Sequence, residues 1–194
     1  RKFYLLTAQR HPEFMGWSQV ELDSRTFNRG LSPVSDTEFS FTEFGGEADR
    51  YLEEYMAIAA AVAEVGDEIA PELKDAYFAA VKYPVTAAAN HAVKMLEAQR
   101  ARSFASGTTR SEMFANNPKL YYSVAKSQQA YQNIRRLTEQ YNQEMSGGKW
   151  RRSMNMRPRD LPVHAAPAVP TLLTDAEVKE WLGRGGETSA HPLD

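Results

Sequence analysis

Two apolar stripes at helical spacing constrain the fold of this chain more than any other feature of its sequence. The first steps by three or four residues through Tyr51, Tyr55, Ile58, Val62, Val65 and Ile69. The second passes through Leu120, Val124, Tyr131, Ile134, Tyr141 and Met145. Each stripe predicts one face of a long helix that has to be buried. Because the two faces need each other or a third helix, we predict an all-α fold, an antiparallel bundle of four to five helices.

Prolines interrupt a further apolar pattern between these stripes. The apolar pattern runs up to Pro84 through Leu73, Ala76, Tyr77, Ala80 and Val81. After Pro84 it resumes with Val85, Ala88, Ala89, Ala92 and Leu96. Pro71 suits the first turn of a helix. Pro84 stands inside the pattern, where an unrelieved proline costs about 3 kcal/mol, so we predict a kink or break there. His91 and Asn90 lie in the middle of the helix that follows, and we expect both to make polar contacts inside the bundle.

Proline and glycine divide the chain into three parts. Residues 1–46 begin with a helical segment that stops before Pro12 and continue as a long aromatic loop, which we expect to pack on an upstream domain. Residues 47–148 form the bundle, which closes at two consecutive glycines. Residues 149–194 form an extended linker with one short helix ending near Leu182, leading towards a further domain. The chain opens on Arg1 as if already inside a helix, so we expect both ends to continue in a longer polypeptide.

Composition excludes several kinds of site. The 194 residues include no cysteine, which rules out disulfides, thiol nucleophiles and thiolate metal sites. The formal net charge of −2 offers no basic face to a nucleic acid. No apolar run approaches the roughly 18 residues that a membrane span needs. The four histidines, His11, His91, His164 and His191, lack the spacing that places ligands on one helix face, so we predict no metal site and no cofactor.

The pattern of carboxylates and aromatic residues gives little support to catalysis within this chain. Glycosidases need two carboxyl groups placed roughly 5 to 9.5 Å apart. Glu13, Glu43 and Glu47 flank the aromatic loop, but nothing singles out a catalytic pair, and we predict no catalytic residue. Trp17 and Trp150 are candidates for stacking on sugar rings. Alternatively, both tryptophans fill the seams between this part of the protein and its neighbours.

Five motifs follow one another along residues 3–170. They are RHPEFMGW at Arg10–Trp17, GEADR at Gly46–Arg50, KYPV at Lys82–Val85 with Asn90, LTEQYN at Leu137–Asn142 with GGKW at Gly147–Trp150, and RPRDLPV at Arg157–Val163. In this order they resemble the region that follows the catalytic barrel in glycoside hydrolase family 115, the xylan α-1,2-glucuronidases. Arg159, in the last motif, is a further candidate for contact with substrate. Other members carry glycine, tyrosine and threonine in that strap, so the likeness is weakest there.

The resemblance implies a parent enzyme that releases glucuronic or 4-O-methylglucuronic acid from glucuronoxylan by hydrolysis of the glycosidic bond, with inversion. The acid and base would come from the barrel upstream, and this chain would be the helical domain between that barrel and a C-terminal β-sandwich. Its implied role is structural, cleft-shaping or dimerising, because family members are often dimers. The expected partners are therefore the two neighbouring domains and a second copy of the chain. We expect this chain alone to be inactive, and the parent to be secreted or periplasmic.

Two readings from other classes remain open. In the first, the chain is a free-standing helical module that recruits a protein partner through an exposed stripe. In the second, it is a carbohydrate-binding module that acts alone. The second alternative is weaker, because such modules usually present their aromatic residues from rigid sheets.

Overall fold

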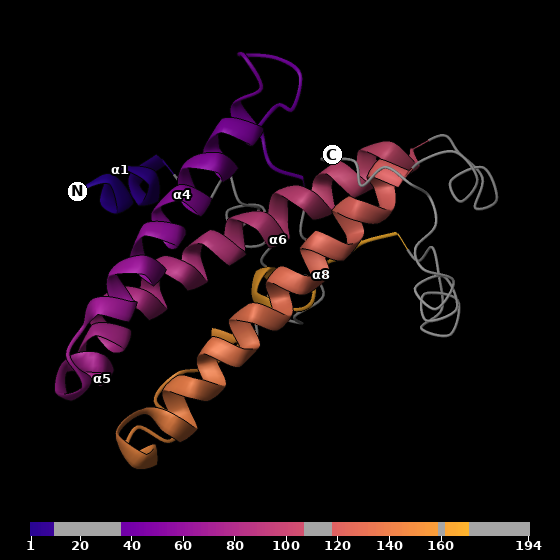
Figure 1. The fold of residues 1–194 in the computed structure, drawn as a ribbon. Helices are drawn as coiled ribbons and strands as arrows, with labels where there is room; N and C mark the ends of the chain where they lie inside the picture. The colour runs from indigo at the N-terminus through magenta and orange to yellow at the C-terminus, as the bar shows by residue number, and fades with distance from the viewer. Residues whose placement is uncertain (10–35, 107–117, 159–161, 171–194) are drawn as a thin grey trace.

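A computed structural model describes residues 1–9, 36–106, 118–158 and 162–170, and these residues form an all-α bundle (Figure 1). No β-strand occurs among them. The main helices are α1 (Lys2–Gln9), α4 (Glu47–Glu68), α6 (Tyr83–Ala105) and α8 (Pro118–Glu139). Successive long helices run in opposite directions, so the predicted antiparallel bundle is confirmed (Figure 1). The short helix predicted near Leu182 lies outside the described residues.

The central element of the bundle is α6. It packs most extensively on α8 and over a smaller area on α4, and the two partner helices lie on either side of it (Figure 1). The core joins Tyr55 from α4 and Leu96 from α6 with Val163 from the short 3₁₀ turn η7 (Pro162–His164). The apolar positions predicted on α6 from Val85 to Leu96 are all buried. Because α6 is covered on several sides, it also determines where the irregular segments attach.

Of the kink or break predicted at Pro84, the break is wrong, because the helix is continuous there. The chain passes through the 3₁₀ turn η2 (Pro71–Leu73), α5 (Lys74–Tyr77) and η3 (Phe78–Lys82) directly into α6. The segment η3 is a π-helical turn, in which Tyr83 N–H donates to the carbonyl of Phe78, five residues earlier. A π turn widens the helix just before the proline ring, which relieves the clash and the lost hydrogen bond that proline otherwise causes. The helix therefore continues through the proline.

The buried face of α8 differs from the predicted apolar stripe. Its buried residues are Leu120, Ser123, Ser127, Ala130 and Thr138. Of the large residues predicted there, Val124, Tyr131 and Ile134 are only half-buried. The Ser127 hydroxyl donates to the backbone carbonyl of Lys94 on α6 at 2.7 Å, so the two helices approach closely. Small side chains make this approach possible. A prediction based on large apolar residues therefore misses the buried face of α8.

The first apolar stripe is buried over only part of its length. Tyr51 and Tyr55 are buried, whereas Val65, further along α4, is 47% exposed. The pattern before Pro84 is also largely wrong. Leu73 is 56% exposed, and Phe78, which the stripe omitted, is the buried residue of that segment. The far end of α4 and the start of the next helix thus project from the core.

The end of α8 packs against the start of α6 through aromatic rings. The helix continues as the π turn η4 (Gln140–Glu144) and the 3₁₀ turn η5 (Met145–Gly148). The rings of Tyr83 and Tyr141 lie 5.0 Å apart, and the hydroxyls of Tyr83 and Thr138 are 3.2 Å apart. Gly147 and Gly148 then end the helix with φ values of 65° and 80°, as the sequence predicted. None of the described helices is long and apolar enough to cross a membrane.

Candidate functional site

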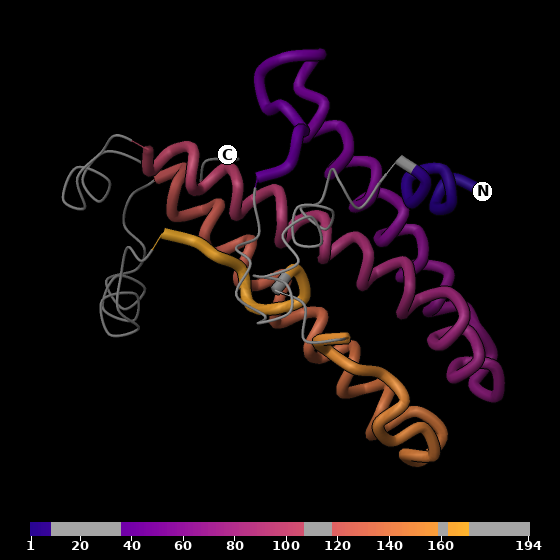
Figure 2. The backbone as a smooth tube through the Cα atoms, turned by 180° about the vertical axis from the view of Figure 1, so that it is seen from behind, coloured from indigo at the N-terminus to yellow at the C-terminus, as the bar shows by residue number. Residues whose placement is uncertain are grey.

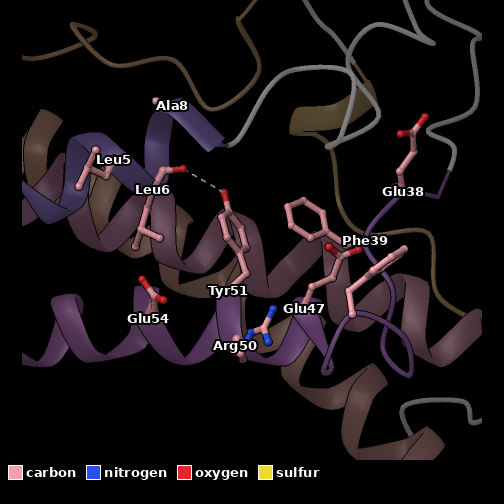
Figure 3. Close-up of a pocket in the computed structure, with 10 residues that line it drawn as sticks. Leu5, Leu6, Ala8, Glu38, Phe39, Glu47, Arg50, Tyr51 and Glu54 are labelled. Carbon is pink, nitrogen blue, oxygen red and sulfur yellow. Dashed lines mark hydrogen bonds between the residues drawn. The ribbon is translucent and has the colours of Figure 1, made fainter.

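An open cavity of about 800 Å³ lies between α1, the start of α4 and the segment 36–46 (Figure 3). It forms because the segment 36–46 loops over the first turns of α4 before entering that helix. Gly45 and Gly46 make the entry possible, with φ values of 68° and 65° that side chains rarely allow. The lining residues are Leu5, Leu6, Ala8, Glu38, Phe39, Phe44, Glu47, Arg50, Tyr51 and Glu54.

The floor of this cavity is aromatic and rigid. Phe39 lies 4.7 Å from Tyr51, measured between ring centroids, and Tyr51 makes an edge contact with Tyr55 at 5.1 Å. The Tyr51 hydroxyl donates to the carbonyl of Leu6 at 3.4 Å and so ties α1 to α4 (Figure 3). The rim presents two large apolar side chains, Leu5 at 57% and Phe44 at 71% exposed, beside the exposed charged groups of Arg50 and Glu54. An aromatic floor with large exposed apolar side chains at its rim suits the surface of another polypeptide.

Two of the charged groups that line the cavity hold the fold. Glu47 accepts a hydrogen bond from the backbone N–H of Ser40 at 2.8 Å, which fixes the loop to the first turn of α4. Glu54 faces Lys2 of α1, with 3.9 Å between charged atoms. Of the acids that the sequence singled out, Glu47 lines the cavity, Glu43 is exposed in the preceding turn, and Glu13 lies outside the described residues.

Polar side chains of α6 hold the irregular segments in place. Lys94 is 1% exposed, and its ammonium group donates to the carbonyls of Val163 at 2.6 Å and Ala165 at 3.0 Å. Burial lowers the pKa of Lys94 to about 8. Gln99, also buried, donates to the carbonyl of Thr37 at 3.1 Å and accepts from the Thr37 N–H at 2.8 Å. One helix therefore holds both the segment before α4 and the segment after the bundle.

Arginines at the end of α6 add further attachments. Arg100 pairs with Asp49 in the first turn of α4, and its guanidinium lies over the Phe41 ring at 4.4 Å. Arg102 pairs with Asp36 and also donates to the carbonyl of Ala168. The sequence analysis missed Lys94 and these arginines as structural residues. Gln99 was detectable, because it continues the α6 stripe three residues after Leu96.

Of the three residues predicted to contact substrate, Trp150 is the one in the described part of the chain. Trp17 and Arg159 lie outside the described residues. Trp150 follows the end of η5 and is 42% exposed, with the Lys149 ammonium 5.3 Å from its ring centroid. Its indole is therefore accessible on the surface, on a different part of the fold from the cavity beside α1.

The polar contact expected for Asn90 on α6 is present. The Asn90 side-chain oxygen accepts from the amide of Asn133 on α8 at 2.9 Å, which links the two helices. The ring of His91 lies 5.9 Å from that of His164 in η7, a proximity that helical spacing does not predict. No group of three or more possible metal ligands occurs within the described part of the chain.

Comparison with protein-family models gives no match for this chain, and comparison with curated proteins gives no significant match either. The family resemblance therefore depends on the five motifs themselves.

Proposed function

We propose that this chain is the accessory helical domain of a xylan-debranching glycoside hydrolase. The parent enzyme would release glucuronic or 4-O-methylglucuronic acid from glucuronoxylan by hydrolysis, and this domain would support and shape the catalytic part. The observation that carries the proposal is the apolar surface around the cavity. Tyr4 is 75% exposed, and it joins Leu5 and Phe44 in presenting large apolar side chains to solvent. The occupant that we assign to this surface is the catalytic barrel upstream of α1.

The positions of the motifs in the fold support the same role. Gly46 starts α4 in a left-handed conformation, and Asp49, three residues later, pairs with Arg100. The KYPV and LTEQYN motifs contact each other, because Tyr83 lies against Thr138 and Tyr141. The motif residues that carry the resemblance thus lie at a helix end and at helix–helix contacts. This is what a family likeness in a structural domain would preserve.

The proposal assigns the chemistry to the neighbouring domain. Three carboxylates line the cavity, and two of them have structural contacts: Glu47 accepts from a backbone N–H and Glu54 faces a lysine, which leaves Glu38 without a carboxylate partner to form a catalytic pair. Such groups hold a loop and a helix, whereas an inverting glycosidase needs one acid and one base on opposite sides of a sugar ring. We therefore expect this chain by itself to have no hydrolytic activity.

The test is an assay of the complete native polypeptide beside the isolated chain. Both are incubated with 4-O-methylglucuronoxylan, and released uronic acids are separated by anion-exchange chromatography. The native polypeptide is expected to release 4-O-methylglucuronic acid, and the isolated chain is expected to release none. The proposal fails if the native polypeptide releases no uronic acid, or if the isolated chain does so alone.

A stand-alone interaction module is the second candidate function. It is favoured by a different surface, where the far end of α4 and the turn after it project from the core and leave Val65 47% exposed and Leu73 56% exposed. Exposed apolar side chains of this kind suit a partner helix. In that case Val65→Glu and Leu73→Glu would abolish partner binding, and the native polypeptide would be inactive on xylan.

A further inference from the structure

A second groove, of about 660 Å³, lies at the opposite end of the bundle from the cavity beside α1. Its walls are the last turns of α8 and the segment that follows η5. Figure 2 shows this segment turning at the end of the helix and running back beside it. We call this feature the arginine groove, after its lining residues Arg135, Glu139, Asn142, Arg151, Arg152 and Asn155.

One side chain joins the two walls of the arginine groove. Asn142 donates from its amide to the carbonyl of Met154 at 2.9 Å and accepts from the N–H of Met154 at 3.0 Å. This pair of bonds clamps the returning segment at a fixed distance from the helix. The backbone of Arg152 adopts a φ of 66°, an uncommon conformation for a residue other than glycine. The backbone of the groove is therefore held by contacts within the chain itself.

The charges in the arginine groove are unbalanced. Three guanidinium groups line it, and Glu139 is the one carboxylate among the described residues that do so. Arg151 and Arg152 are exposed and have no ion pair or side-chain hydrogen bond with another described residue. By contrast, Arg100 and Arg102, near the end of α6, are each paired with an aspartate. The third arginine of the groove, Arg135, donates to the neutral side chain of Gln132 at 3.2 Å. Like charges that line one groove repel one another, and a bound anion would reduce that cost.

Neutral groups in the arginine groove complete a set of donors. Asn155 accepts from the N–H of Arg157 through its side-chain oxygen at 2.9 Å, which leaves its amide hydrogens available to a ligand. Guanidinium groups present paired N–H donors whose geometry matches carboxylate and phosphate oxygens. A hydrated, polar ligand suits such a lining better than a fatty acid does.

We propose that the arginine groove binds an oxyanion carried by a polar ligand, either the carboxylate of an acidic sugar or a phosphate group. Arg151 and Arg152 supply the principal charge-assisted hydrogen bonds, Arg135 adds a third positive charge from α8, and Asn155 adds a neutral donor. This site is independent of the proposed function, since an anion can bind here whether or not the parent cleaves xylan.

The test is calorimetric titration of the chain at low ionic strength with sodium D-glucuronate and, separately, with inorganic phosphate. We expect saturable binding that weakens as salt is added. Arg151→Gln and Arg152→Gln are each expected to weaken binding about tenfold, as the loss of a charge-assisted bond predicts. Glu139→Gln removes the opposing carboxylate and is expected to strengthen binding about fivefold. Stronger binding of glucuronate identifies an acidic sugar as the ligand, and stronger binding of phosphate identifies a phosphate ester.

Arg136→Gln is the matched control. Arg136 lies on the same turn of α8 but donates to the side chain of Asn133 at 2.6 Å and does not line the groove. Its substitution removes the same charge and should change affinity by less than about twofold. An equal loss in Arg136→Gln would show attraction to net charge alone and overturn the site. The absence of saturable binding for both anions would also overturn it. Circular dichroism of each variant confirms that the fold is retained.

Discussion

Replacing Lys94 by methionine is expected to remove a pH dependence from the stability of this bundle. Burial lowers the pKa of Lys94 from its ordinary value of 10.5 to about 8 in the folded chain. Between these two values the unfolded chain binds more protons than the folded chain, so raising the pH favours folding. This contribution is fully present above the unfolded pKa and is lost as the pH falls through the folded pKa. The wild-type chain should therefore gain about 3 kcal/mol over Lys94→Met from neutral pH to about pH 10.

The measurement is urea unfolding of both proteins across that pH range, followed by far-UV circular dichroism. Lys119→Met is the control, because Lys119 is an exposed residue of α8. Its difference from the wild type should stay constant with pH. A constant difference for Lys94→Met as well would contradict the burial of a titrating amine at this position. The carbonyls of Val163 and Ala165 would then need another donor.

The second large effect is expected at the contact between α6 and α8. Ser127 is fully buried, and its hydroxyl touches the α6 backbone, so a larger side chain has no room. Ser127→Leu should destabilise the chain by about 3 kcal/mol through overpacking. Ser127→Ala keeps the space and loses one hydrogen bond, which should cost about 1 kcal/mol.

The neighbouring residue supplies the matched control for this substitution. Gln128 is exposed on the same turn of α8, and Gln128→Leu adds the same side chain without entering the contact. Its free energy of unfolding should stay within about 0.5 kcal/mol of the wild type. If urea unfolding gives Ser127→Leu and Gln128→Leu equal stability, the close approach of the two helices is wrong.

The sequence predicted the fold class well because helical periodicity depends on local spacing. The stripe from Val85 to Leu96 is buried as expected, and the helical segment that continues from α8 through η4 and η5 ends at the predicted glycines. The buried face of α8 was missed because Ser123 and Ser127 are small and polar, and only the nearness of α6 makes them core residues. The break at Pro84 was wrongly predicted because the spacing of apolar residues does not reveal the π turn that precedes the proline.

The candidate sites were harder to predict than the fold. Lys94 is a charged residue, and nothing in its immediate sequence shows that carbonyls 69 and 71 residues later accept its hydrogen bonds. The arginine groove depends on the clamp between Asn142 and Met154, which folds the Lys149–Arg152 cluster back beside the helix. Tertiary contacts of this kind are not encoded in spacing along the chain.

The central claim is that this bundle works as one domain of a larger glucuronoxylan-debranching enzyme. The most direct measurement is the intact mass of the native polypeptide, isolated with an antibody against the bundle and analysed by mass spectrometry. The account predicts a polypeptide far larger than the 21.8 kDa of the present chain, with several hundred residues before Arg1. A native mass of 21.8 kDa would contradict the accessory-domain assignment and favour a helical module that binds a separate partner.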